Sequence, residues 1–325
     1  AGQINQTDRI SEFLRRAHTF LRSERGAPVL LEVPSDVAME EIAGIDSNYR
    51  PVKTYKSAGN PADVKEIAKL LLSAKRPVIY AGQGVLWAES TNQLIALAEL
   101  INAPVATTNS GKSAFPENHP LALGAAGNTV TKMARHFVDE ADLVFGIGSS
   151  FTTNLASMNI PSGKTLVQTT IDAKDLNKEH DLTHAIIGDC QLVLSQLIEE
   201  ITSQSGGVGR EDSGIVAEVA KVKNEWLEEW LPLLTSEEIP INPYRIIWDL
   251  MHTVDLDNTV VTHDSGHPRD QLIPFWESTV PRGYLGWGNS TQLGYSLGLV
   301  LGAKLASPEK TFINFMGDAA IGMAG

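Results

Sequence analysis

Short apolar runs alternate with helical patterns between residues 61 and 202. After Pro61, which suits the first turn of a helix, four apolar residues recur three or four positions apart. They are Val64, Ile67, Ala68 and Leu71. Further helices are predicted over 92–102 and 191–201, and strands over 76–82, 103–107, 143–148 and 165–171. Continuous apolar strands that alternate with helices indicate an α/β fold, with parallel-sheet domains covered by helices on both faces.

Further patterns lie on either side of this block. A helix over 14–21 and a strand over 28–33 are typical of the end of a preceding domain. Residues 40–60 contain Gly, Asn and Pro without periodicity and predict a linker, and the Gly- and Ser-rich run 203–214 marks a second boundary. The remaining elements are predicted helices over 215–231, 244–253 and 293–305, and strands over 259–262 and 311–316.

Length and charge exclude several classes of protein. The chain has 325 residues, enough for about two domains of roughly 150 residues each. Its net charge of −13 and the lack of a basic patch argue against a nucleic acid partner. No run approaches the roughly 18 apolar residues of a membrane span. The single cysteine, Cys190, cannot form an internal disulfide, fits a reducing compartment and is expected to be small, buried and apolar. We therefore expect a cytoplasmic protein.

The strongest local signal is the run TFINFMGDAAIGMAG at 311–325. A buried strand that ends in Gly317 and Asp318 places a carboxylate at the carboxyl end of a sheet, where open α/β folds bind ligands. Gly317 would let a phosphate approach the backbone, and Asp318 offers the oxygen ligand that Mg²⁺ prefers. A tight turn with a capping Asp explains the same residues, and both interpretations stay open.

Three other patterns are less specific. Gly294, Gly298 and Gly302 recur on one helix face, which predicts close packing against the sheet or against a second copy. The run THDSGHPRD at 262–270 concentrates two His, two Asp and one Arg, but its spacing matches no metal site, so a polar strand-to-loop junction is expected. The run from Gly82 to Gly84 lacks the third glycine of a dinucleotide fingerprint.

Several motifs occur in a characteristic order. GAPVLLEVPSDV begins at Gly26, AKRPVIYAGQGV and ADLVFGIGSSF lie in the middle block, and QLGYSLGLVLGAKLASP and FMGDAA come last. In this order the chain resembles the thiamine diphosphate-dependent enzymes of the acetolactate synthase, decarboxylase and carboligase family. The resemblance covers essentially the whole chain. It divides the chain into the end of a pyrimidine-binding domain (1–40), a linker (41–60), a middle Rossmann-like domain (61–202), a linker and helix (203–239), and the first part of a diphosphate-binding domain (240–325).

The resemblance implies a cofactor site for thiamine diphosphate and Mg²⁺. Asp318 would be the Mg²⁺ ligand. Thr291 would offer its backbone carbonyl to the aminopyrimidine, and Leu293 would be the apolar wedge that holds the cofactor bent, with core packing as its alternative role. The residues expected beside the diphosphate are Gly266, His267, Gly317, Ala319 and Ala320. The implied activity is decarboxylation or carboligation of a 2-keto acid by a homodimer or homotetramer. The alternative is a non-catalytic nucleotide-binding or structural homologue.

The sequence also departs from the family's pattern. It has Gly-Asp-Ala where the family has Gly-Asp-Gly, and Thr291 stands where Gly is common. The activating Glu and the second metal ligand, an Asn, are expected outside this chain, so we expect a fragment without decarboxylase or carboligase activity of its own. Relatives that bind FAD have an Arg two residues after the glycine corresponding to Gly148, whereas Ser150 stands here. We therefore expect no tightly bound FAD.

Overall fold

The computed structural model describes the chain except residues 24, 43–51, 128, 155–156, 212–213, 287–291 and 325. It divides into two compact units, Ala1–Ala58 and Gly59–Gly325. None of the described helices combines the length and apolarity that a membrane crossing needs.

The first unit contains a long helix and a small parallel sheet. Helix α1 spans Ile10–Arg22, and strand β1 (Gly2–Gln3) pairs with β2 (Leu31–Glu32). A short helix, α2 (Ser35–Ala38), follows β2. The strand predicted over 28–33 is thus shorter than its apolar run, because only two residues find a neighbouring strand.

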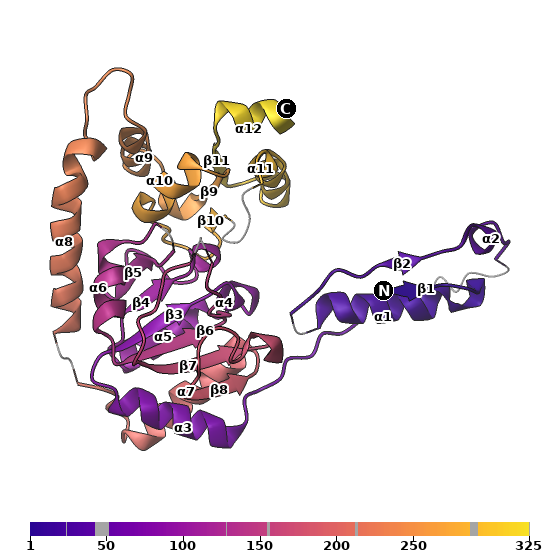
Figure 1. Cartoon of the computed structure of the whole chain (residues 1–325), viewed down its shortest axis with the longest axis horizontal. Coiled ribbons are helices and arrows are strands. Elements are labelled where there is room, and N and C mark those ends of the chain that lie inside the picture. Colours follow the sequence, from indigo (N-terminus) through magenta and orange to yellow (C-terminus); the bar gives the residue numbers. More distant parts are fainter. Residues whose placement is uncertain are drawn as a thin grey trace. The chain divides into compact units, whose positions relative to one another are not determined.

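The larger unit is built on a six-stranded parallel sheet in the order β5-β4-β3-β6-β7-β8 (Figure 1). Its strands are β3 (Pro77–Ala81), β4 (Val105–Thr107), β5 (Ala122–Ala125), β6 (Leu143–Ile147), β7 (Thr165–Thr170) and β8 (His184–Ile187). Helices cover both of its faces: α3, α5 and α7 pack together, and α6 packs on β5. These helices and the short α4 span Pro61–Ser73 (α3), Gly84–Trp87 (α4), Thr91–Leu100 (α5), Lys132–Glu140 (α6) and Cys190–Gln204 (α7). The predicted parallel α/β architecture is confirmed.

Helix α3 shows how local sequence builds this layer. Asn60 accepts a hydrogen bond from the backbone N–H of Ala62, and Pro61 occupies the first turn, where no N–H is needed. The apolar stripe faces inward, and the four positions predicted from periodicity are the four buried ones: Val64, Ile67, Ala68 and Leu71.

The strand order reverses between β3 and β6, the place where open sheets often bind nucleotides. Here the two strand ends instead approach each other closely. A Cβ atom added to Gly82 would lie 2.2 Å from the carbonyl oxygen of Gly148, and one added to Gly84 would lie 2.6 Å from Cα of Gly148. These glycines therefore serve backbone packing rather than a ligand cradle.

Helix α8 (Ile215–Leu234) connects the two sheets of the larger unit. Its Trp226 stacks on Phe275, with ring centroids 4.9 Å apart and planes 5° apart. Trp230, one turn later, contacts Phe275 and Tyr244 edge to face. This aromatic cluster holds α8 against the helices that follow it.

A three-stranded parallel sheet in the order β10-β9-β11 completes the unit. Its strands are β9 (Thr259–His263), β10 (Tyr284–Leu285) and β11 (Thr311–Phe315), and the surrounding helices are α9 (Pro243–Met251), α10 (His267–Phe275), α11 (Tyr295–Ala306) and α12 (Asp318–Ala324). Helices α10 and α11 both pack on β9 and β11.

At two of three positions the glycine face of α11 does not pack against the sheet, so that alternative is wrong there, while packing against a second copy stays a prediction. A Cβ atom added to Gly298 or Gly302 would meet nothing within 4 Å among the described atoms. Only Gly294, just before the helix, is crowded, with Cβ of Ala324 at 2.7 Å from its added Cβ. The periodicity identified a face of α11 correctly but not the neighbour that would have to lie on it.

Candidate functional site

Two acidic residues follow neighbouring strands at the carboxyl edge of the smaller sheet. Strands β9 and β11 pair in parallel with Phe315 opposite His263, so both strands end at the same edge. Asp264 comes directly after β9, and Asp318 begins α12 three residues after β11. The two carboxylates have different surroundings, and these surroundings decide which of them can bind a ligand.

Asp264 is buried and fully engaged by the protein. Its carboxylate accepts hydrogen bonds from the backbone N–H of Ser265 at 2.9 Å and of Gly294 at 3.1 Å. It also accepts from the backbone N–H of Ser296 at 3.2 Å and from the Ser296 hydroxyl at 2.8 Å. Burial alone would raise the pKa of Asp264, but these hydrogen bonds outweigh it and hold the pKa below its ordinary value. Asp264 therefore fixes the start of α11 and has little capacity left for a metal ion.

Asp318 is exposed, and no residue in the described part of the chain hydrogen-bonds to its carboxylate or forms an ion pair with it. Beside it, a Cβ atom added to Gly317 would meet no described atom within 4 Å. An available carboxylate next to an open stretch of backbone fits a hard cation that also binds phosphate oxygens.

Gly266 lies at the same edge, in the turn between β9 and α10. Its φ of 80° and ψ of −145° belong to a region that only glycine adopts readily. A Cβ added to it would meet no described atom within 4 Å, so the backbone here is open on its outer side. His267, the first residue of α10, is exposed next to it. The structure thus brings Gly266 and His267 to the edge where Gly317 and Asp318 lie.

The other sequence-predicted site residues differ in their exposure. Leu293 is 41% exposed, which does not fit the alternative of a core-packing role. Ala319 is exposed, whereas Ala320 is buried at 2% exposure, so its side chain contributes packing of α12. Thr291 lies outside the described residues.

A buried polar pair next to the site was not predicted from the sequence. The ring of His263 contacts that of Tyr284, with centroids 5.5 Å apart. His263 donates from Nδ1 to the carbonyl of Asp264 at 3.0 Å, while its Nε2 and the Tyr284 hydroxyl have no partner among the described atoms. Burial lowers the pKa of His263 to about 4, so its ring is neutral at pH 7. A histidine at the end of an apolar strand was the available signal.

A different cluster has the spacing of metal ligands. His136, Glu140 and Glu218 bring their ligand atoms within 4.8 Å of one another. However, Arg76 pairs with Glu140 at 2.9 Å and with Glu218 at 2.8 Å. Both carboxylates are thus already engaged by Arg76, and the cluster ties α8 to α6 rather than offering an open metal site.

Comparison with known proteins assigns the class of the chain. The central domain of thiamine pyrophosphate enzymes matches residues 64–197, and their C-terminal thiamine pyrophosphate-binding domain matches residues 264–325. The chain belongs to the thiamine pyrophosphate enzymes.

Several individual proteins of known name are similar to this chain over nearly its whole length. The chain is 30% identical over 335 residues to the probable acetolactate synthase large subunit of Methanococcus aeolicus, covering 99% of this chain and 56% of that protein. It is 32% identical over 340 residues to the corresponding protein of Methanocaldococcus jannaschii, covering 97% of this chain and 54% of that protein. A probable sulfoacetaldehyde acetyltransferase of Rhizobium meliloti is 26% identical over 344 residues, covering 99% of this chain and 57% of that protein. The chain thus spans about half the length of these relatives.

A solved structure supports the fold. The crystal structure of benzoylformate decarboxylase from Polynucleobacter necessarius matches with a TM-score of 0.75 and 21% sequence identity. The match covers 98% of this chain and 57% of that chain. The arrangement of parallel sheets and helices is therefore shared with this decarboxylase over nearly the whole chain.

Proposed function

We propose that this chain supplies part of the diphosphate and Mg²⁺ site, including the ligand Asp318, of an acetolactate synthase-like enzyme that decarboxylates a 2-keto acid, joins it to a second carbonyl compound, or both. The observation that carries the proposal is the contrast between the two acidic residues at the carboxyl edge. Asp264 is saturated with hydrogen bonds, whereas Asp318 is exposed and available beside Gly317 and Gly266. The names of the acetolactate synthase relatives support the reaction class.

Each residue of the edge has a distinct role in this proposal. Asp318 would hold Mg²⁺, and the open backbone at Gly317 and Gly266 would lie against the diphosphate, with His267 beside the same phosphates. Leu293 would press on the cofactor from the start of α11. Thiamine diphosphate supplies the electron sink for decarboxylation and carbon–carbon bond formation when bound, while the protein positions it and excludes water. The buried Asp264 keeps the start of α11, and with it Leu293, in a fixed place.

We also propose that the middle sheet binds no flavin. Phe151 stacks on Tyr80 with ring centroids 5.8 Å apart, and a Cβ added to Gly146 would lie 2.4 Å from the Phe151 ring. The aromatic ring thus fills the space beside the carboxyl end of β6. Purified protein with a flavin absorption band would contradict this part of the proposal.

The assembly and location of the enzyme are proposals of the same kind. A homodimer or homotetramer in the cytoplasm, acting on a 2-keto acid without a nucleic acid partner or a membrane, accords with the family and with the net charge of −13. Light scattering at several protein concentrations measures the oligomeric state directly.

The central experiment is titration of thiamine diphosphate by calorimetry, with and without Mg²⁺, using a protein restored to the full length of the acetolactate synthase relatives. In Asp318→Ala we expect loss of the Mg²⁺-dependent binding with the thermal stability unchanged, because the carboxylate is exposed and bonds to no described residue. The matched control is Glu309→Ala, an exposed carboxylate at the amino end of β11 and thus at the opposite edge. Unchanged Mg²⁺ dependence in Asp318→Ala would contradict the assignment of Asp318, whereas failure of the unchanged protein to bind thiamine diphosphate would favour a non-catalytic homologue.

Leu293 offers a second test of the same site. Because its side chain is 41% exposed, Leu293→Ala should leave the melting temperature of the cofactor-free protein nearly unchanged while weakening thiamine diphosphate binding. Leu293→Met keeps the apolar bulk and should preserve both. A large fall in stability with unchanged cofactor affinity would mean that Leu293 is a packing residue.

A further inference from the structure

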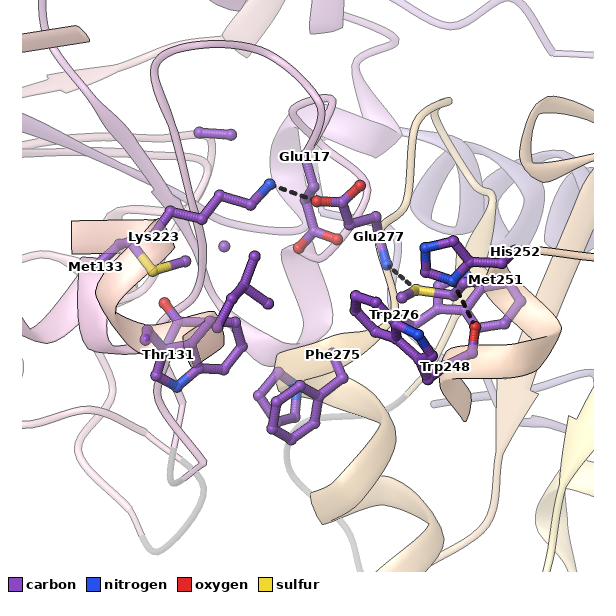
Figure 2. Close-up of a pocket in the computed structure, with 15 residues that line it drawn as sticks. Glu117, Thr131, Met133, Lys223, Trp248, Met251, His252, Phe275, Trp276 and Glu277 are labelled. Carbon is purple, nitrogen blue, oxygen red and sulfur yellow. Dashed lines mark hydrogen bonds and ion pairs between the residues drawn. The ribbon is translucent and has the colours of Figure 1, made fainter. Parts of the chain in front are cut away.

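A hollow lies between the two sheets of the larger unit. It has a volume of about 210 Å³ and is bounded by β5, α6, α8, α9 and α10 (Figure 2). The hollow is partly open to solvent, and a pocket of this size with a mostly apolar lining is a candidate ligand site.

Apolar residues make up most of the lining of this hollow, and four of them are the aromatic residues Trp226, Trp248, Phe275 and Trp276. Trp226 and Phe275 are stacked, and Trp276 is buried at 2% exposure. Trp248 lies on the other side, with its ring 4.3 Å from that of His252. Since these rings are held by one another and by their own helices, the walls cannot readily collapse into the space. Flat rings around a preformed space favour a flat aromatic ligand.

Two methionines add adaptable contacts to these rings. Met133 and Met251 line opposite sides of the hollow, and the sulfur of Met251 accepts a hydrogen bond of 3.2 Å from the backbone N–H of Glu277 (Figure 2). Thioether sulfur interacts favourably with aromatic rings, and the flexible side chain adjusts to the outline of a ligand.

The charges around the hollow are already balanced. Lys223 forms an ion pair with Glu277 at the rim, as Figure 2 shows. The carboxylate of Glu117, which also lines the hollow, accepts hydrogen bonds of 2.5 and 2.6 Å from Lys112. Because these Lys and Glu side chains are already paired with one another, they offer an ionic ligand no free counter-charge, which favours a neutral molecule.

We propose that this hollow binds a neutral aromatic molecule of one or two fused rings, with one polar group directed to the Lys223–Glu277 pair. The size is consistent, because a cavity of about 150 Å³ is known to hold benzene. The site is separate from the carboxyl edge with Asp318, and the proposal does not depend on thiamine diphosphate binding.

The test uses indole as the probe and methyl-labelled methionine as the reporter. The chain contains six methionines, of which Met133 and Met251 line the hollow and Met39 is 85% exposed in the first unit. Titration with indole, followed by NMR, should give saturable shifts of the Met133 and Met251 methyl signals and none at Met39. Absence of saturable shifts at the two lining methionines would overturn the proposal.

Charged and non-planar analogues test the proposed ligand class, and two variants test the location of the site. Indole-3-acetate, an anion, and tryptamine, a cation, should bind at least about tenfold more weakly than indole, and phenol should bind more tightly than its non-planar analogue cyclohexanol.

Leu227→Trp, which fills the hollow from α8, should weaken indole binding at least about tenfold, whereas Trp87→Ala, at a tryptophan 74% exposed elsewhere, should not. Equal binding of the charged analogues, or unchanged binding in a folded Leu227→Trp protein, would contradict the proposed ligand class or its location. If Leu227→Trp does not fold, the methyl shifts of the unchanged protein still decide the matter.

Discussion

The carboxylate of Asp264 accepts a 2.8 Å hydrogen bond from the hydroxyl of Ser296, the second residue of α11. Because this buried carboxylate also accepts three backbone N–H groups, Asp264→Asn should lower the free energy of unfolding by about 2 kcal/mol. Ser296→Ala removes only the hydroxyl bond and should lower it by about 1 kcal/mol. Urea denaturation of both variants measures these differences.

Asp318→Asn is the control for this pair of variants. Its carboxylate is exposed and makes no bond to the described residues, so its stability in urea should match that of the unchanged protein. If Asp318→Asn and Asp264→Asn lost equal stability, the difference inferred between the two acidic residues would be wrong.

The ion pair between Lys112 and Glu117 is buried, with side chains 1% and 7% exposed. Burial raises the pKa of Glu117, and the ammonium of Lys112 opposes this effect. Glu117→Gln would leave the buried cation without its counter-charge and should destabilise the protein by about 3–5 kcal/mol. The double variant Lys112→Met with Glu117→Gln should recover most of that loss. Chemical denaturation measures the free energy of unfolding of the single and the double variant. Equal values for the two variants would argue against an electrostatic cause.

The neutral His263 gives the stability a defined pH dependence. Burial lowers its pKa from 6.5 to about 4, so at pH values between these two the unfolded chain binds a proton that the folded chain does not. Stability is therefore full above pH 6.5 and decreases as the pH falls toward 4, by about 2 kcal/mol between pH 8 and pH 5. His263→Asn keeps a donor for the Asp264 carbonyl and does not titrate. Between pH 8 and pH 5 the free energy of unfolding of His263→Asn should therefore fall by about 2 kcal/mol less than that of the unchanged protein. Denaturation at each pH measures both values.

The glycines around the start of α11 should respond in opposite directions to alanine. At Gly298 nothing described lies within 4 Å of an added Cβ, and alanine is the better helix former, so Gly298→Ala should raise stability by about 0.5–1 kcal/mol. Gly294 has a φ of 85°, and Cβ of Ala324 lies 2.7 Å from its added Cβ, so Gly294→Ala should lower stability. Thermal unfolding measures both, and a destabilised Gly298→Ala would show that this face is covered in solution.

Most helices and strands of the larger unit could be predicted, because the local sequence of each one is sufficient to indicate it. The Asn-Pro start of α3 and its apolar stripe determine both the helix and its buried face without reference to distant residues. The strands β3 and β6 likewise follow from continuous apolar runs. Short elements such as β5, with the sequence ALGA, have too little local signal and form because a neighbouring strand is present.

The candidate site was predictable only in part. Motif resemblance pointed to Gly266 and Asp318, and the parallel pairing of β9 with β11 brings their two turns to one edge. The role of Asp264 could not be predicted, because it depends on donors about 30 residues away in the sequence. The glycine periodicity of α11 could not tell whether this face packs on the sheet or on a second copy, because a pattern within one helix carries no information about its neighbour.

The loop around Lys112 has a consequence for how the larger unit unfolds. The backbone N–H of Glu117 donates to the carbonyl of Ser278, and the N–H of Ser278 donates to the carboxylate of Glu117. The hydroxyl of Ser113 accepts a hydrogen bond from the backbone N–H of Arg282. The loop between β4 and β5 is therefore bonded at two places, Ser278 and Arg282, to the segment that leads into β10. Opening either sheet would expose these polar groups and the buried ion pair together. The two sheets therefore have little freedom to melt separately, and their amide protons should exchange with solvent in one cooperative event.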